Sequence, residues 1–242
     1  MLKNDSGNGN AERGSRKREQ HNGKVYMKIH ELISSDAGPI ILWGMYPHRP
    51  GQLEDTKAAI EKAAGAEKYA LIAFQADDWN SDFSPWQAVT PDTVFPGNGE
   101  QMLEYITNES IPALRSKYGN DREIYIMGYS LAGLFALWAC ARRTDIFAGA
   151  ASCSGSLWYP EFIHFLRSER GINGKRIYLS LGGKEANTPN KLMATVADCT
   201  KEAVEILKKE NTVKYEMNPG GHFADSGKRL AKAVRWIAGY GK

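Results

Sequence analysis

Short, predominantly apolar runs recur along this chain of 242 residues, and turn residues bound each of them. Such runs lack the polar alternation of a half-exposed strand, so they suit strands that are covered on both faces, as in a parallel sheet. Segments with the apolar spacing of an amphipathic helix separate them. This alternation predicts an α/β fold with a mostly parallel central sheet and helices on both faces. The expected strands are 39–43, 69–74, 124–127, 147–152, 177–181 and 213–217, and the expected helices are 52–64, 100–118, 131–142, 160–168, 190–209 and 226–237.

The N-terminal part of the chain differs from the rest. Residues 1–23 are polar, rich in Gly, Asn and charge, and without periodicity, so we expect a disordered tail. Polar and apolar residues then alternate over 25–33, which predicts a half-exposed edge strand. No linker, composition break or repeat divides 24–242, so we predict one domain there.

The net charge of +3 is confined to one part of the chain. A basic excess in residues 1–24 accounts for all of it, and the remainder is neutral. The neutral remainder of the chain has no excess of basic residues that could bind nucleic acid, so we expect no nucleic-acid partner.

Residues 124–141 carry no charge and are as long as the shortest helix that spans a membrane. Gly128, Ser130 and Gly133 interrupt this stretch, and its first half is typical of a strand. A buried strand that turns into a buried helix explains it better. The N-terminus also lacks the apolar core of a secretory signal. We therefore predict a soluble, cytoplasmic protein without a membrane partner.

The three cysteines are Cys140, Cys153 and Cys199. An odd, sparse count is no disulfide framework, and no Cys-x-x-Cys motif or Cys/His cluster indicates zinc. We expect small buried side chains at these positions.

The sharpest passage from strand to helix lies at 126–133, with the sequence IMGYSLAG. A strand that ends, turns at Ser130 and continues as a helix has the layout of a nucleophile elbow, which lifts the hydroxyl clear of the sheet. Gly128 and Ala132 are small enough to let strand and helix pass closely, although Ala132 replaces the usual glycine. The alternative is a serine that caps an ordinary helix.

A nucleophilic serine needs a base, and the chain has five histidines. His222 lies in the Gly-rich loop 217–223, directly after the last expected strand and before the last helix. Such a loop can bring the imidazole to Ser130, so we predict His222 as the base. The other histidines lie in the tail, on the edge strand, after the first buried strand and on the helix 160–168; they are His21, His30, His48 and His164.

The base needs a carboxylate that lies between serine and histidine in chain order. Glu185 follows the strand 177–181 in a turn with the sequence GGKE. Asp198 lies inside an amphipathic helix and Glu161 opens another, so both are expected to face water. We predict Glu185 as the acid that holds the imidazole tautomer and stabilises imidazolium.

Backbone N–H groups are expected to bind the oxyanion that forms during attack on a carbonyl. Leu131 follows the serine at a helix start, where the dipole favours negative charge, so its N–H is one expected donor. Gly44 allows close approach in the loop after the strand 39–43, which makes the Met45 N–H the second expected donor. A plain turn at this strand end is the alternative.

Several of these motifs resemble one known family. The elbow around Ser130, the segment SGSLWY at 154–159, the turn with Glu185 and the Gly-Gly before His222 look like the esterase-D-like family of α/β-hydrolases. The segment 154–159 is similar to the branch that contains siderophore trilactone esterases. The resemblance covers about residues 24–240. It implies an α/β-hydrolase fold without a large cap domain and a Ser-Glu-His hydrolase of carboxylic esters.

A long loop at 76–99 follows the second buried strand and holds Trp79 and Trp86. Its place at the catalytic edge predicts a wall or lid of the substrate pocket, with Trp158 on another wall. The alternative is that each tryptophan anchors its segment on the core. The predicted substrate-binding set is Trp79, Trp86, Trp158, Tyr129 and His48.

Asp78, Asn80 and Asp82 have the spacing that opens a calcium-binding loop. Phe83 stands where such a loop needs Gly, and Val89 where it needs Glu, so we expect no bound calcium. The expected chemistry needs neither a metal nor an organic cofactor.

Together these residues predict a serine esterase that acts through an acyl-enzyme intermediate. The expected partner is a small-molecule ester with a small or aromatic acyl group. A thioesterase or acyltransferase with the same triad is one alternative, and a non-catalytic binding protein on this fold is another.

Overall fold

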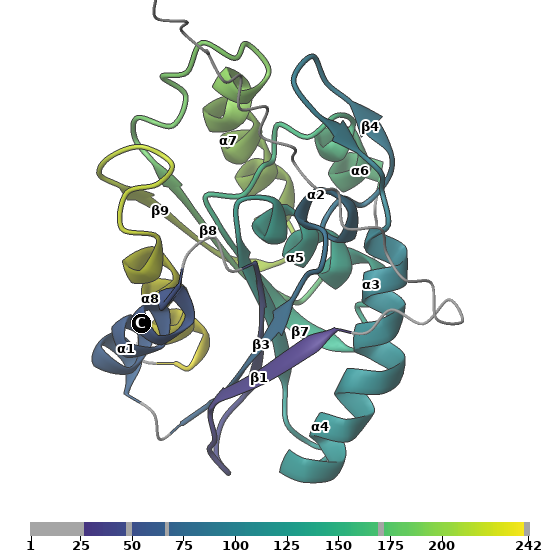
Figure 1. The fold of residues 1–242 in the computed structure, drawn as a ribbon, viewed down its shortest axis with the longest axis vertical. Coiled ribbons are helices and arrows are strands. Elements are labelled where there is room, and N and C mark those ends of the chain that lie inside the picture. The colour runs from purple at the N-terminus through teal and green to yellow at the C-terminus, as the bar shows by residue number, and fades with distance from the viewer. Residues whose placement is uncertain (1–26, 47–49, 66–67, 169–171, 240–242) are drawn as a thin grey trace, which may run out of the picture.

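A seven-stranded sheet forms the centre of the protein (Figure 1). The structure is a computed structural model that describes residues 27–46, 50–65, 68–168 and 172–239. The strands of the sheet, in chain order, are β1 (Lys28–Ile33), β2 (Ile40–Met45), β3 (Ala70–Gln75), β6 (Ile124–Tyr129), β7 (Phe147–Cys153), β8 (Arg176–Gly182) and β9 (Thr212–Asn218). Their spatial order is β1-β3-β2-β6-β7-β8-β9. All neighbours are parallel except β1, which runs antiparallel to β3, so the predicted mostly parallel sheet is confirmed.

The apolar runs become strands because both of their faces are covered, except in β9, which lies at the edge of the sheet, carries Lys214 and Glu216 and is only partly buried. In β2, Ile40 and Leu42 belong to the apolar cluster on one face of the sheet. Ile41 and Trp43 belong to the cluster on the other face, and the whole strand is buried. A strand in this position gains from an apolar residue at every place, which removes the polar alternation from its sequence.

Helices cover both faces of the sheet, as predicted (Figure 1). One face carries α1 (Gln52–Ala64) and α8 (Ser226–Ile237), and the other carries α3 (Gly99–Tyr105), α4 (Ile111–Tyr118), α5 (Leu131–Arg142), α6 (Phe162–Ser168) and α7 (Val196–Leu207). α1 and α8 also pack against each other.

The uncharged stretch at 124–141 is β6 followed by α5. Every residue of α5 from Leu131 to Ala141 is buried, which explains why the helix has no polar face. Within the described ranges, no helix is long and apolar enough to cross a membrane. The expected cytoplasmic location stays a prediction.

Two helices differ from their expected ranges. The expected helix at 100–118 is α3 and α4 joined by a π-helical turn, Ile106–Ser110. The expected helix at 190–209 becomes α-helical only at Val196, after a 3-10 turn at Met193–Thr195. The apolar spacing continues across both junctions, so periodicity alone does not reveal them.

The loop at 76–99 contains elements too short to be predicted from sequence. They are α2 (Trp79–Asp82) and a hairpin of β4 (Ala88–Val89) and β5 (Val94–Phe95). Two carboxylates of the segment that resembles a calcium loop accept hydrogen bonds from the backbone at α2. Asp78 Oδ1 accepts the Ser81 N–H at 3.1 Å, and Asp82 Oδ2 accepts the Asp78 N–H at 3.0 Å.

The parallel strands bring their carboxyl ends to one edge of the sheet. Ser130, Glu185 and His222 follow β6, β8 and β9 at this edge. The tail expected at 1–23 lies outside the described residues, and the single domain at 24–242 stays a prediction.

Candidate active site

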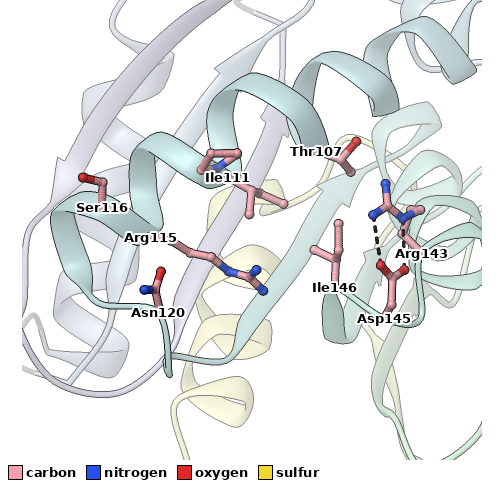
Figure 2. Close-up of a pocket in the computed structure, with 9 residues that line it drawn as sticks. Thr107, Ile111, Arg115, Ser116, Asn120, Arg143, Asp145 and Ile146 are labelled. Atoms are coloured by element: carbon pink, nitrogen blue, oxygen red, sulfur yellow. Dashed lines mark hydrogen bonds and ion pairs between the residues drawn. The ribbon is translucent and has the colours of Figure 1, made fainter.

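Two cavities of the described part lie at opposite edges of the sheet. One has a volume of about 580 Å³ and lies beside α4, at the amino ends of β6 and β7 (Figure 2). Arg115, Arg143 and Asp145 help to line it, and two N–O distances of 3.0 Å join the guanidinium of Arg143 to the carboxylate of Asp145. None of the predicted site residues that the structure describes lines this cavity.

The other cavity has a volume of about 1210 Å³ and lies at the carboxyl ends of the strands. It brings together residues predicted for catalysis with three of the aromatic residues predicted to bind substrate. The predicted residues that line it are Met45, Trp79, Tyr129, Ser130, Trp158, Glu185 and His222.

Ser130 lies in a strained turn between β6 and α5. Its backbone angles, φ 57° and ψ −123°, are ones that residues other than glycine rarely adopt. Strand and helix pass so closely that a Cβ atom on Gly128 would lie 2.2 Å from the carbonyl oxygen of Ala132. Glycine is therefore required at this place, and the segment has the strand-turn-helix layout expected from its sequence.

Neighbouring segments hold the backbone of Ser130. Its N–H donates to the Cys153 carbonyl at 3.1 Å. Its carbonyl accepts the N–H groups of Gly133 at 3.0 Å and of Leu134 and Ser156 at 3.1 Å. A strained residue persists only where its surroundings determine its conformation, and these bonds do so here.

His222 lies in the loop after β9, and its imidazole reaches both predicted partners. Nε2 is 3.0 Å from Ser130 Oγ, and Nδ1 is 2.7 Å from Glu185 Oε2. A neutral imidazole with its proton on Nδ1 donates to the carboxylate and accepts from the serine hydroxyl. The three side chains therefore lie in one hydrogen-bonded chain.

The carboxylate of Glu185 is buried in the turn after β8. Oε2 faces His222, whereas Oε1 accepts the Gly182 N–H at 2.6 Å and the Arg229 guanidinium at 2.7 Å. A Cβ atom on Gly182 would lie 2.8 Å from this Oε1 and 2.6 Å from the Gly220 carbonyl oxygen. The glycine therefore makes room for the carboxylate.

The surroundings of Glu185 keep it ionised. Burial raises its pKa, but hydrogen bonds from the side chains of His222 and Ser154 and from the Gly182 N–H outweigh burial, so the pKa is lowered overall. An ionised carboxylate is the form that holds an imidazole tautomer and stabilises imidazolium.

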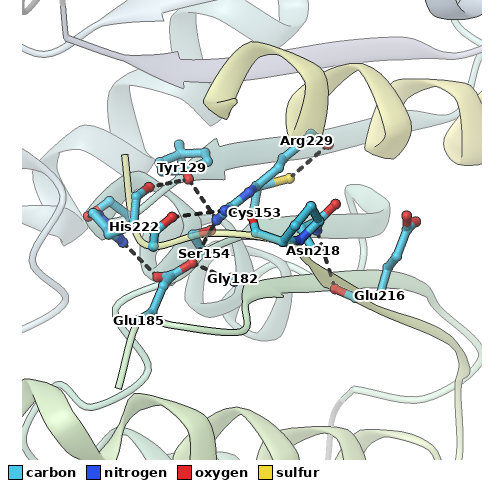
Figure 3. A network of polar contacts seen from close by, with 12 residues as sticks. Tyr129, Cys153, Ser154, Gly182, Glu185, Glu216, Asn218, His222 and Arg229 are labelled. Carbon is cyan, nitrogen blue, oxygen red and sulfur yellow. Dashed lines mark hydrogen bonds and ion pairs between the residues drawn. The ribbon is translucent and has the colours of Figure 1, made fainter. Parts of the chain in front are cut away.

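Arg229 is part of this network, and sequence reasoning missed it (Figure 3). It lies in the first turn of α8, and its Nη1 donates to Ser154 Oγ at 2.7 Å and to the Tyr129 hydroxyl at 3.1 Å. The sequence does hold a signal, because Arg229 lies one helical turn before Ala233 on the apolar face of α8.

Tyr129 connects the strand of the serine to the loop of the histidine. Its hydroxyl donates to the His222 carbonyl at 2.5 Å. Burial raises the pKa of Tyr129 to about 12, so the hydroxyl keeps the proton that it donates.

Two predicted substrate-binding residues are not placed at the cavity. The Nε1 of Trp86 donates to the Pro160 carbonyl at 3.1 Å, and its ring packs against Phe162 and Phe165. Trp86 therefore anchors the loop 76–99 on α6 and does not form a cavity wall. His48 lies outside the described residues.

Other lining residues were not predicted. They include Tyr46, Lys184, Met193 and Phe223. Phe223 is 92% exposed, and its ring stands edge-on to that of His222 with the centroids 5.1 Å apart. Lys184 and Phe223 are sequence neighbours of the predicted acid and base, and this adjacency is the signal that could have indicated them.

The two expected oxyanion donors lie at the end of a strand and at the start of a helix. Leu131 is the first residue of α5, and N–H groups in a first helical turn have no partner inside their helix. Gly44 and Met45 were expected in a loop, but they are the last two residues of β2, paired with Phe74 and Gln75 of β3, and both line the cavity.

The chain matches one family model over residues 51–237, and this family is described as Putative esterase. The chain belongs to this family. It is thereby identified as a carboxylic ester hydrolase, which confirms the resemblance of its motifs. One relative, the uncharacterized protein YbbA of Bacillus subtilis (strain 168), is 26% identical over 206 residues, which cover 79% of this chain and 80% of the relative.

Solved structures of two hydrolases are similar to this esterase. The IroE-like serine hydrolase from Shewanella oneidensis has a TM-score of 0.69 at 15% identity, over 87% of this chain and 79% of that chain. The siderophore hydrolase EstA from Aspergillus nidulans has a TM-score of 0.65 at 14% identity, over 91% of this chain and 97% of that chain. Both likenesses confirm the expected α/β-hydrolase fold.

Proposed function

We propose that this esterase forms an acyl-enzyme on Ser130, with His222 as general base and Glu185 as the acid that orients it. One observation carries the proposal: Ser130 Oγ lies 3.0 Å from His222 Nε2, and His222 Nδ1 lies 2.7 Å from Glu185 Oε2. Nucleophile, base and acid are thus within direct hydrogen-bond reach, as this chemistry requires.

In the first step, His222 takes the hydroxyl proton while Ser130 attacks the ester carbonyl. Glu185 keeps the imidazole proton on Nδ1 and stabilises the imidazolium that forms. The N–H groups of Leu131 and Met45 bind the oxyanion of the tetrahedral intermediate. The base and the oxyanion donors each contribute about 10²- to 10⁴-fold to the rate.

Collapse of the intermediate gives the acyl-enzyme. The imidazolium protonates the departing alcohol, and water that His222 deprotonates then attacks the acyl group. The carboxylic acid leaves and the Ser130 hydroxyl is restored. Neither step uses a metal or an organic cofactor.

The proposed substrate is a small-molecule ester with a small or aromatic acyl group. Trp79, Tyr129 and Trp158 line the cavity around Ser130, and aromatic walls favour planar apolar groups. The volume of about 1210 Å³ also accommodates larger esters. The likeness to EstA, which is named a siderophore hydrolase, supports the inclusion of siderophore lactones in the assay.

Labelling with a fluorophosphonate tests the nucleophile. We expect the probe on Ser130 by mass spectrometry of the labelled peptide and no labelling of Ser130→Ala. Ser168→Ala, which removes an exposed serine from α6, is the matched control and is labelled like the wild type. Labelling that persists in Ser130→Ala contradicts the proposal.

A substrate panel tests the reaction. It contains aryl esters, short acyl esters, siderophore lactones and matched thioesters, with and without an alcohol acceptor. We expect ester hydrolysis, and a loss of about 10³-fold or more in kcat/KM in His222→Ala. Full activity of His222→Ala contradicts the proposal. Faster thioester turnover, or transfer to the acceptor, replaces it with a thioesterase or an acyltransferase.

A further inference from the structure

One buried arginine contacts every segment that carries a predicted catalytic group. Arg229 is 1% exposed, whereas Lys228 and Lys232 on the same helix are exposed. A buried cation destabilises a protein unless it is paired and hydrogen-bonded, and a well-packed apolar residue is often the more stable choice. The reason for a buried arginine at this position therefore has to be sought in its hydrogen bonds.

Nη1 of Arg229 reaches the carboxyl ends of three adjacent strands. It donates to the Tyr129 hydroxyl at 3.1 Å, to Ser154 Oγ at 2.7 Å and to Glu185 Oε1 at 2.7 Å. Tyr129 is the last residue of β6, Ser154 follows β7, and Glu185 follows β8. The strand that leads to the nucleophile and the turn of the acid thus share one donor atom.

Nη2 of the same guanidinium holds the loop of the base. It donates to the Pro219 carbonyl at 3.1 Å and to the Gly221 carbonyl at 2.8 Å. The two residues before His222 are glycines, which give this loop wide conformational freedom. The hydroxyl of Tyr129 adds a bond to the His222 carbonyl at 2.5 Å.

We propose that Arg229 is a positioning residue that holds the Glu185 carboxylate and the His222 loop in register with Ser130. The inference rests on the proposed triad. Arg229 and the Gly182 N–H together occupy Oε1 of the carboxylate, so Oε2 faces the imidazole. Rotation of the carboxylate, or movement of the glycine loop, would break the hydrogen-bonded chain to the serine.

Arg229 acts through other residues and not on the substrate. It is buried and is not among the residues that line the cavity. Its planar guanidinium can serve several acceptors at set angles, which a lysine ammonium on a flexible stem does not reproduce. This geometry explains why an arginine stands at this point of an otherwise apolar helix face.

Kinetics of Arg229 variants test the inference with the best ester of the panel. Arg229→Lys keeps the positive charge but loses the planar guanidinium with its several N–H donors, and Arg229→Met loses both the charge and the donors. We expect kcat to fall about 10-fold in Arg229→Lys and about 100-fold in Arg229→Met, with KM changed by about threefold at most, because the hydrogen bonds of Arg229 hold the acid and the loop of the base rather than the tryptophans of the cavity wall. Arg235→Met, which removes an exposed cation from the same helix, is the matched control with wild-type kcat and KM.

A double-mutant cycle separates positioning from a merely structural role. In a Glu185→Gln background, we expect Arg229→Met to lower kcat less than in the wild type, because the carboxylate that Arg229 orients is already lost and only its hold on the His222 loop remains. If the fold-loss in kcat of the double variant equals the product of the losses of the two single variants, Arg229 and Glu185 act independently and the inference is overturned. Circular dichroism confirms that each variant is folded at the assay temperature.

Tyr129→Phe provides a measurement that does not require Arg229→Met to fold. It removes the hydroxyl that joins Nη1 to the His222 carbonyl, and we expect a lower kcat at unchanged KM. If the wild type is labelled at Ser130 and Arg229→Lys and Tyr129→Phe both keep its kcat, the inference is overturned while the triad stands. If the wild type is not labelled at Ser130, the triad and the inference both fall.

Discussion

Two arginine–carboxylate pairs lie beside cavities at opposite edges of the sheet, and they differ in burial. The side chains of Arg229 and Glu185 are 1% and 2% exposed, and those of Arg143 and Asp145 are 34% and 67% exposed. The pKa of both carboxyls is lowered. The hydrogen bond from Arg143 is the main cause for Asp145, whereas for Glu185 burial opposes the lowering and several hydrogen bonds outweigh it.

This difference shows that the edge of the sheet with the candidate active site holds its side chains more tightly than the opposite edge does. Water screens an exposed pair, so it contributes little stability, whereas a buried pair must stay complete because either partner alone is an uncompensated charge. Strained backbone conformations also lie at the edge of the sheet that carries the buried pair. Among the described residues, the non-glycine residues with positive φ are Ser130, Ser154, Glu161 and Asp225. All four lie in segments after the carboxyl ends of strands, and none lines the smaller cavity.

Removing one charge from the buried pair should have the largest effect. In Glu185→Gln, the neutral amide no longer stabilises imidazolium, and Arg229 stays buried without a counter-charge. We expect kcat/KM to fall about 10³- to 10⁴-fold and the free energy of unfolding to fall by about 3–5 kcal/mol. Steady-state ester hydrolysis and urea unfolding measure the two losses. Activity within tenfold of the wild type would argue against Glu185 as the acid.

Acid unfolding should also distinguish the pairs. Folding lowers the pKa of Glu185 from its ordinary value of 4.5, so near this pH the unfolded state binds more protons. The stabilisation is present above the unfolded pKa and is lost as pH falls through the folded pKa. We expect this group to contribute up to about 1.4 kcal/mol per pH unit to the acid slope, and Glu185→Gln to remove that contribution.

Urea unfolding across the acidic range measures these slopes. Asp145→Asn serves as the comparison, because an exposed carboxylate changes the slope less. Equal slopes in the wild type and Glu185→Gln would show that the buried carboxylate does not govern acid stability.

The sequence predicts those parts of the site that are local patterns. Ser130, Glu185 and His222 each follow an expected strand and lie within two residues of a glycine, so their place at a strand end can be inferred without tertiary information. The parallel sheet is predictable for a similar reason, because burial on both faces leaves a wholly apolar run. The hairpin of β4 and β5 is too short to leave any periodicity.

Contacts between distant segments account for what the sequence does not predict. The partners of Arg229 lie at the end of β6, in the segments after β7 and β8 and in the loop after β9, and the sequence pattern of α8 indicates none of them. Trp86 fits a cavity wall or an anchor equally well until Phe162 and Phe165 supply the surface on which it packs. Both outcomes are set by tertiary packing rather than by local propensity.

The strain at Ser130 offers a smaller test of the constrained edge. Ser130→Gly and Ser130→Ala both remove the nucleophile, but only glycine adopts φ 57° without steric cost. We expect Ser130→Gly to be more stable than Ser130→Ala by about 1–2 kcal/mol, since relief of strain exceeds the entropic cost of glycine. Urea unfolding of the two variants measures the difference. Equal stabilities would mean that the elbow stores no strain.

The smallest effect is expected at the exposed pair. Asp145→Asn removes one charge from the pair with Arg143, whose guanidinium can turn to water, so no buried charge remains uncompensated. We expect the free energy of unfolding to fall by about 1 kcal/mol at most, less at high salt, with kcat and KM unchanged. The same measurements as for Glu185→Gln apply. A loss of stability comparable to that of Glu185→Gln would show that burial is not what separates the two pairs. The sensitivity of the Arg229–Glu185 pair to substitution would then need a cause other than desolvation.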